Sequence, residues 1–159
     1  MVATRILVLA ANPSDTAKLH LSREVREIQD GLALSAGRDQ FEVISQWAVR
    51  PEDLRRALLK YKPSIVHFSG HGMGDQGLVF ENDLGQSKFV SASTLAKLFK
   101  LCPSVQCVLL NACYSEMQAV AIAQHIQYVI GMNKDIGDRA AIQFAVGFYD
   151  GIGDGRSVE

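Results

Sequence analysis

Two side chains of this 159-residue sequence are of the types that form a nucleophile and its base, and each follows an apolar stretch of strand length. His71 comes directly after residues 64–70, and Cys113 comes directly after residues 106–112. A cysteine thiol becomes an efficient nucleophile when a histidine lies within hydrogen-bonding reach. If the two stretches are neighbouring parallel strands, both side chains project over the same edge of a sheet. The pattern therefore predicts attack by a thiol on a carbonyl carbon.

The residues next to this pair favour the same chemistry. Gly72 follows His71, and a glycine lets the backbone approach a substrate carbonyl closely. We expect the backbone N–H groups of Gly72 and Cys113 to form an oxyanion hole. Ser115 is expected to begin a helix, with Gln118 three residues later completing a capping box. The positive end of that helix is expected to favour the thiolate of Cys113.

Strand-like and helical segments alternate along the chain, which is typical of an α/β protein with a mainly parallel sheet flanked by helices. Continuous apolar runs, as in strands buried on both faces, predict strands at residues 5–11, 41–49, 64–70, 106–112 and 128–132. Helical patterns cover residues 19–32, 51–61, a short segment capped by Ser91 or Ser93, a segment from Ser115, and residues 138–151 or 138–153. A small β-hairpin is predicted at residues 77–90, after the third strand.

Sites in such sheets gather beyond the carboxyl ends of the strands. Three polar side chains follow or end predicted strands there: Asn12, Asn111 and Asp135. We expect them to line a pocket that binds the substrate.

Length, composition and charge limit the classes of protein to which this sequence can belong. The length fits one domain, and 48% hydrophobic with 21% charged residues is ordinary for a globular core. A net charge of −1 argues against nucleic acid as a partner. The apolar runs are too short to span a membrane, and the N-terminal residues lack a signal-peptide pattern. The three cysteines lack zinc-type spacing, which fits a protein of a reducing compartment. We therefore expect a cytoplasmic protein that needs no cofactor and binds no membrane.

Two other kinds of site are weaker interpretations. His67 and His71 have the spacing that chelates zinc on a helix, but on a strand they lie ~13 Å apart. We therefore predict no metal site and expect His67 to be a hydrogen-bonded core residue. Residues 72–77 match G-x-G-x-x-G, but residues 78–81 look like a strand where a dinucleotide-binding fold needs a helix. A flavodoxin-like small-molecule binder is a third, weaker interpretation, which needs a helix after Gly74 and which a hairpin at residues 78–90 would exclude.

The remaining candidates have structural interpretations. Cys107 lies inside an apolar strand, and Cys102 precedes a proline, so both are expected to be structural. The charged run at residues 23–27 is interpreted as a solvated helix face.

Two segments together resemble a known family. VHFSGHG at residues 66–72 and LLNACYS at residues 109–115 are similar to the two motifs of the caspase-like peptidases, and most similar to those of the bacterial CHAT domains. The resemblance covers nearly the whole chain. It implies a caspase-like three-layer sandwich and a cysteine endopeptidase, with His71 as general base and acid and Cys113 as the acylated nucleophile.

The sequence departs from that pattern in two places. Relatives that cut after Arg or Lys often carry an acid where this chain has Asn111, and Asp135 could supply acidity in its place. The family pattern also continues into another helix beyond residue 159. We therefore expect one CHAT domain over residues 1–159, truncated at its C-terminal end or part of a longer protein.

The resemblance further implies fused sensor or regulatory domains, a protein or peptide substrate, and pairing of two copies through an exposed final strand. A non-catalytic interaction module of the same fold is the alternative.

Overall fold

Five parallel strands form the central sheet of this protein, seen in a computed structural model that describes residues 3–158. The sheet has the order β2–β1–β3–β7–β8. Its strands are β1 (Thr4–Ala10), β2 (Phe41–Gln46), β3 (Ile65–Ser69), β7 (Cys107–Asn111) and β8 (Tyr128–Ile130). Each overlaps an apolar run that predicts a strand, and β1 begins one residue earlier than expected, at Thr4. The second is shorter than expected, because Ala48 turns the chain with a positive φ of 51°.

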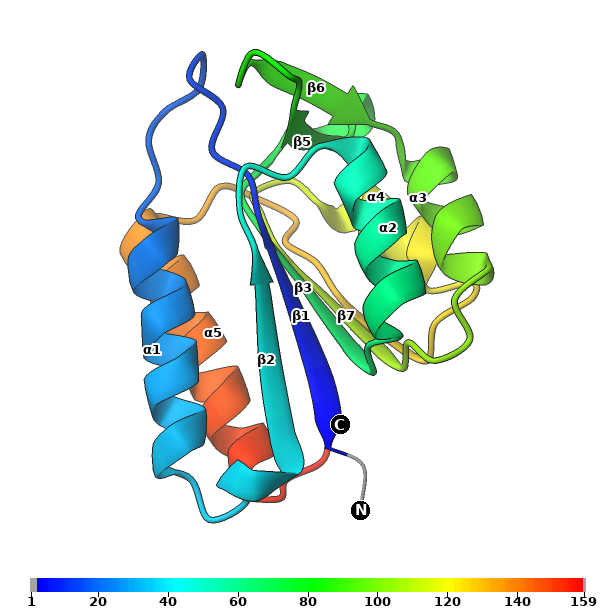
Figure 1. Cartoon of the computed structure of the whole chain (residues 1–159). Helices are drawn as coiled ribbons and strands as arrows, with labels where there is room; N and C mark the ends of the chain where they lie inside the picture. The colour runs from blue at the N-terminus through cyan, green and yellow to red at the C-terminus, as the bar shows by residue number, and fades with distance from the viewer. Residues whose placement is uncertain (1–2, 159) are drawn as a thin grey trace.

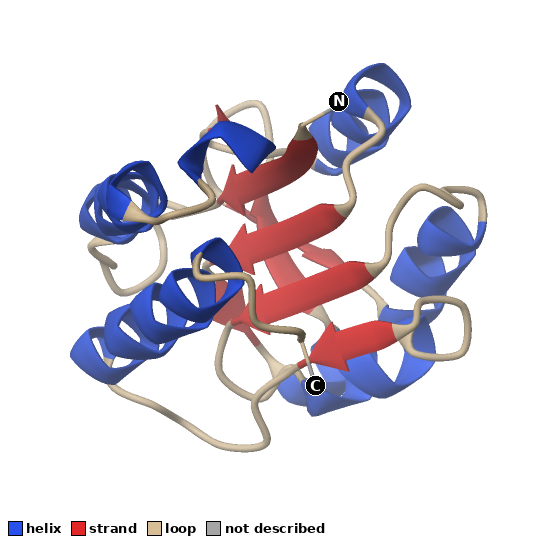
Figure 2. Ribbon diagram, turned by 90° about the horizontal axis from the view of Figure 1, so that it is seen from below, coloured by secondary structure: helices blue, strands red, loops and turns tan. Residues whose placement is uncertain are grey.

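Helices cover both faces of this sheet. The helices are α1 (Leu21–Leu34), α2 (Pro51–Tyr61), α3 (Ala92–Lys100), α4 (Glu116–Ile122) and α5 (Asp138–Gly153), with short 3₁₀ turns η1 (Arg38–Gln40) and η2 (Gly74–Gln76). Figure 1 shows α1 and α5 side by side on one face and α2, α3 and α4 on the other. The view from below in Figure 2 shows the strands between the two helical layers. The three-layer α/β architecture predicted from the sequence is confirmed.

Side chains of β1 alternate between two hydrophobic cores, which explains why its apolar run is continuous. Leu7 and Leu9 pack toward α2 and α3, whereas Ile6 and Val8 pack toward α1 and α5. All four are at most 1% exposed. The sheet is therefore a rigid base for groups at its edge.

Local signals set the ends of the helices. Pro51 begins α2, and the Asp53 carboxylate accepts the Arg50 N–H at 2.9 Å. Of the two serines expected to cap α3, Ser91 does so, since its hydroxyl accepts the Thr94 N–H at 3.2 Å.

A second, three-stranded antiparallel sheet lies beyond the carboxyl ends of the parallel strands (Figure 1). It consists of β4 (His71–Gly72), β5 (Leu78–Glu81) and β6 (Ser87–Val90). The predicted hairpin is thus confirmed, and it excludes the helix that a dinucleotide-binding or flavodoxin-like site would need there. The segment expected to be only a glycine-rich turn also contains β4, because His71 pairs with Val79.

Candidate active site

His71 and Cys113 occupy equivalent positions at the ends of two neighbouring strands. β3 and β7 are parallel and adjacent, and Ser69 is paired with Asn111. His71 and Cys113 each follow two residues later, and both line one cavity of about 40 Å³. The sheet register therefore brings the two predicted catalytic side chains to the same cavity.

The ring of His71 is held by a backbone carbonyl. Its Nε2 lies 2.7 Å from the carbonyl oxygen of Ala17, in the loop between β1 and α1. A carbonyl oxygen only accepts hydrogen bonds, so Nε2 carries the proton of this bond. In the neutral ring, Nδ1 is then the free acceptor. The contact therefore sets the tautomer that a general base needs.

Asn12 closes the loop that carries Ala17. Its side-chain amide donates to the Leu19 carbonyl at 3.2 Å, and its side-chain oxygen accepts the Leu19 N–H at 3.3 Å. Its backbone N–H donates to Glu81 of β5 at 2.9 Å. Asn12 was predicted to bind substrate, but here both ends of its amide are engaged within the loop. It does not line the cavity shared by His71 and Cys113.

The thiol of Cys113 contacts the segment that precedes α5. Sγ lies 3.1 Å from Asp135 Oδ1 and accepts the Ile136 N–H at 3.3 Å. Burial is the main reason that the pKa of this thiol is raised above its ordinary value, and the bond to Asp135 raises it further, whereas the Ile136 N–H lowers it. The direction of this pKa differs from the thiolate expected at the start of α4, because burial and the bond to Asp135 both favour the protonated thiol.

The helix start after Cys113 also differs from its prediction. Ser115 is the N-cap residue of α4, but its hydroxyl donates to Leu110 O at 3.3 Å and accepts the Met132 N–H at 3.0 Å. Gln118 donates instead to Gly74 O at 2.7 Å. The predicted capping box is therefore absent, because tertiary contacts occupy both side chains.

Gly72 lies directly against Cys113. An added Cβ on Gly72 would lie 2.1 Å from the Cys113 carbonyl oxygen, which is closer than real atoms approach. The absence of a side chain at residue 72 therefore allows the two backbones to touch. This contact brings together the two residues whose N–H groups were predicted to form an oxyanion hole.

A buried polar cluster lies beneath the cavity. Glu24 of α1, which is 2% exposed, accepts hydrogen bonds from Ser69 Oγ and Asn111 Nδ2. Asn111 Nδ2 also donates to Ala141 O at 3.1 Å. The expectation that residues 23–27 form a solvated face is wrong for Glu24, because these donors on β3 and β7 replace its water. Sequence reasoning missed Glu24, since the partners are distant along the chain.

His67 lies in the same layer and is fully buried. Its Nδ1 is 3.0 Å from the Tyr149 hydroxyl, and its Nε2 is 3.6 Å from the Glu24 carboxylate. The prediction that His67 is a hydrogen-bonded core residue is confirmed. Burial, followed by the nearby Cys107 and Glu24, holds the pKa of Tyr149 well above its ordinary value, so its hydroxyl stays protonated.

The other two cysteines are buried away from this cavity. Burial raises the pKa of Cys107 to about 11 and also raises the pKa of Cys102. Their structural interpretation agrees with these environments, because a buried thiol is a poor nucleophile.

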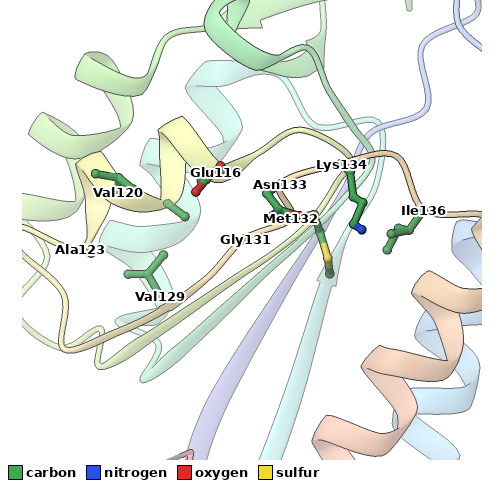
Figure 3. A pocket seen from close by; sticks show the side chains of 10 residues that line it. Glu116, Val120, Ala123, Val129, Gly131, Met132, Asn133, Lys134 and Ile136 are labelled. Carbon is green, nitrogen blue, oxygen red and sulfur yellow. The ribbon is translucent and has the colours of Figure 1, made fainter.

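A larger groove of about 430 Å³ is lined by Ile136 as well, which belongs to the segment that contacts Cys113. Figure 3 shows its walls, which come from α4 and from residues 131–136. The labelled side chains include Glu116, Val120, Ala123, Val129, Met132, Asn133, Lys134 and Ile136. Ile136 lines both the groove and the smaller cavity, so one short segment separates them.

Within residues 3–158, His, Cys, Asp and Glu side chains do not gather in groups of three or more that could hold a metal ion. None of the helices in the same range is long and apolar enough to cross a membrane.

The parallel sheet between helical layers, with a histidine and a cysteine at the ends of adjacent strands, defines the class of caspase-like cysteine peptidase folds. The CHAT domain family model matches residues 2–159. The chain belongs to the CHAT domain family.

Similar proteins and structures agree with this class. A Roc-COR-CHAT protease from an unknown prokaryotic organism is 29% identical over 153 residues, covering 91% of this chain and 14% of the relative. A Roc-COR-CHAT protease of Runella zeae is 29% identical over 150 residues, which cover 91% of this chain and 15% of the relative. A secreted C11 cysteine protease from Bacteroides thetaiotaomicron, solved with an irreversible peptide inhibitor, has a TM-score of 0.58 and 13% identity, covering 86% of this chain and 50% of that one.

The chain thus spans about one seventh of the length of these two curated relatives. The structural likeness concerns the fold, and the assignment of an activity rests on the residues of the site.

Proposed function

We propose that this domain is a cysteine endopeptidase that hydrolyses peptide bonds in protein substrates through His71 and Cys113. The observation that carries the proposal is the register of β3 and β7, which brings the two residues to one cavity. The bond from His71 to Ala17 O supports it, because it leaves Nδ1 as the base.

In the proposed reaction, Nδ1 of His71 takes the Cys113 thiol proton as Sγ attacks the peptide carbonyl carbon. The carbonyl π bond breaks, and the resulting oxyanion is held by the N–H groups of Gly72 and Cys113. The C–N bond then breaks while His71 protonates the leaving amine, which gives a thioester on Cys113. A water molecule, deprotonated by His71, hydrolyses the thioester and restores the thiol.

The thiol must leave Asp135 before this can happen. In this structure Sγ is bonded to Asp135 and Ile136, and its raised pKa favours the protonated form. Substrate or a partner must therefore displace Asp135 and Ile136 from Cys113, a local rearrangement of the kind that completes many active sites.

Cleavage of a peptide library by the purified protein tests the proposal. Cys113→Ala is expected to abolish cleavage while leaving the circular dichroism spectrum and the melting temperature unchanged. Cys102→Ala is the matched control, since its buried thiol is outside the cavity, and it should retain cleavage. Cleavage that persists in Cys113→Ala would refute the proposal.

A second candidate is a non-catalytic interaction module of the same fold. The engagement of Cys113 by Asp135, rather than by a base, favours it. The two candidate functions predict different reactivities for the Cys113 thiol. A peptide electrophile that labels Cys113 much faster than Cys102 at neutral pH supports the peptidase, whereas equal labelling supports the module.

Regulation by fused or partner domains belongs to the same proposal, because the relatives are much longer chains. Pairing of two copies through β8, one of the two edge strands of the described sheet, is a separate proposal that sedimentation can test. Residence in the cytoplasm stays a prediction from the sequence.

A further inference from the structure

The carboxylate of Glu24 joins the two strands that carry the catalytic pair. Its Oε2 accepts a hydrogen bond from the Ser69 hydroxyl of β3, and its Oε1 accepts one from the Asn111 side-chain N–H of β7. Ser69 and Asn111 are paired in the register of the sheet, and each lies two residues before the proposed base or nucleophile. One oxygen of the carboxylate therefore serves each strand, just before the chain reaches His71 and Cys113.

This bridge lies where the backbone ladder between β3 and β7 weakens. The residue pairing of the ladder ends at Ser69 and Asn111. The next backbone contact, from the Gly70 N–H to the Asn111 carbonyl, has an N–O distance of 3.4 Å, whereas such bonds usually measure ~2.9–3.0 Å. The contact of Gly72 with Cys113 limits how closely the two strand ends approach each other. The bridge through the carboxylate limits how far they separate.

Glu24 is itself held in place by its helix. It lies in the first turn of α1, which Figure 1 shows at the carboxyl edge of the sheet. Val25 and Ile28 anchor this part of α1 in the core that it shares with α5. Asn111 is held a second time, because its Nδ2 also donates to Ala141 O of α5 at 3.1 Å. The carboxylate is therefore a fixed point against which the strand ends are set.

A buried histidine faces the same carboxylate from β3. The His67 Nδ1 lies 3.0 Å from the Tyr149 hydroxyl, which stays protonated because burial holds its pKa well above the ordinary value. When this hydroxyl donates to Nδ1, the ring proton is on Nε2, which lies 3.6 Å from Glu24 Oε2 and has no hydrogen-bond partner among the described residues. The other tautomer would direct a lone pair at the carboxylate. An N–H therefore faces the oxygen that also accepts from β3.

We propose that Glu24 is a positioning residue, whose carboxylate holds the ends of β3 and β7 at the separation at which His71 Nδ1 reaches Cys113 Sγ. The inference rests on the proposed peptidase function, and Glu24 acts through Ser69 and Asn111 rather than by contact with the reacting atoms. A misplacement of catalytic groups by about 1 Å can cost ~10²-fold in rate. The bridge is therefore expected to affect the rate of the chemical step more than the affinity for substrate.

Glu24→Gln keeps the shape of the side chain and replaces one acceptor by a donor. Its NH2 group would face either the Asn111 amide N–H or the His67 ring N–H, so the bond to one strand is lost. Ser69→Ala weakens the same bridge from β3 by removing a single hydroxyl, and it carries the test if Glu24→Gln does not fold. Glu27→Gln is the matched control, since Glu27 lies on the same helix and does not line the cavity.

Labelling of Cys113 by one peptidyl acyloxymethyl ketone, followed by mass spectrometry of the intact protein, measures the chemical step. The limiting rate constant at saturating probe is expected to fall about tenfold in Glu24→Gln and about threefold in Ser69→Ala. The probe concentration that gives half of this rate should stay within about twofold, because the contacts to the probe remain. Glu27→Gln should react as the unmodified protein does.

The same measurement in His71→Ala separates positioning from general support of the fold. If Glu24 acts by placing His71 against Cys113, then Glu24→Gln should change the labelling rate by less than about twofold once the imidazole is absent. A general loosening of the fold would instead slow labelling by the same factor in both backgrounds, which is the result expected of independent changes.

The outcomes are distinct. A slowing by Glu24→Gln that disappears in the His71→Ala background supports the inference. Three results would overturn it: a labelling rate that Glu24→Gln does not lower, an equal slowing with and without His71, or a loss confined to the half-saturating probe concentration. Each of them leaves the peptidase proposal standing, provided that His71→Ala alone slows labelling. If the probe does not label Cys113, or if His71→Ala labels at the normal rate, the proposed function fails and this inference fails with it.

Discussion

Gly72 is packed against the carbonyl of Cys113 so closely that a Cβ at residue 72 would lie 2.1 Å from that oxygen. The contact joins the strand end that carries the proposed base to the strand end that carries the proposed nucleophile. The clash would be between a Cβ, whose position the backbone of residue 72 fixes, and a backbone carbonyl, so no side-chain rotation can relieve it. The spacing of the site therefore depends on a glycine at this position.

The variant Gly72→Ala is expected to lose most peptidase activity and about 1–3 kcal/mol of stability, since the backbone of Cys113 must shift to admit the methyl group. Urea denaturation and peptide cleavage measure the two effects. Gly147→Ala is the control, because Gly147 lies within α5 and its added Cβ would meet no atom of the other described segments within 4 Å. That change should increase stability by up to about 1 kcal/mol and keep activity. Full activity in Gly72→Ala would show that the close contact is not needed.

Asn12 is expected to be a positioning residue that acts through Ala17 and His71. Asn12→Ala removes both bonds to Leu19 and frees the loop that holds the His71 ring. We expect kcat to fall about tenfold with KM little changed, because the general base is displaced while substrate contacts remain. Asn12→Asp keeps the acceptor for the Leu19 N–H but loses the donor, so it should recover part of the loss.

Ser14→Ala serves as the control for this loop. Its hydroxyl bonds only to Gly85 O at 3.1 Å, at an exposed position. Its kinetics should match those of the unmodified protein. A rise in KM without a fall in kcat for Asn12→Ala would instead assign Asn12 to substrate binding, as the sequence predicts.

The reactivity of Cys113 should depend on Asp135. The Asp135 carboxylate raises the thiol pKa, in addition to the larger effect of burial. Asp135→Asn removes the negative charge, so the pKa falls and more thiolate is present at a given pH below it. Because the thiolate is the reactive form, alkylation of Cys113 by iodoacetamide should become faster near neutral pH, and its pH curve should move to lower pH.

Asp75→Asn, a change at an exposed residue of η2, should leave the alkylation curve in place. A curve that stays fixed in Asp135→Asn, or moves to higher pH, would contradict the contact between Asp135 and the thiol.

The sequence allows the sheet and the catalytic pair to be predicted because both depend on local patterns. Apolar runs of strand length identify β3 and β7, and parallel strands place their following residues at one edge. His71 and Cys113 were found in this way, since their side-chain types carry the chemistry. The order of strands in the sheet then brings them to one cavity.

The groups that surround and support the catalytic pair cannot be predicted from such local patterns. Ala17 acts through a backbone carbonyl, which every residue type possesses, so its side chain gives no signal. Glu24 lies in a charged helical run and is buried only because Ser69 and Asn111, 45 and 87 residues away, donate to it. The raised pKa of the Cys113 thiol is hidden from the sequence for the same reason, because its burial and its contact with Asp135 depend on a segment beyond β8.

The most direct test of the account is the rate at which a peptide electrophile labels Cys113 with and without its proposed base. A peptidyl acyloxymethyl ketone should label Cys113 about 100-fold more slowly in His71→Ala than in the unmodified protein, because a positioned base contributes ~10²–10⁴-fold. His125→Ala, at an exposed turn after α4, should label at the normal rate. Equal rates in the two variants would contradict the claim that His71 activates Cys113.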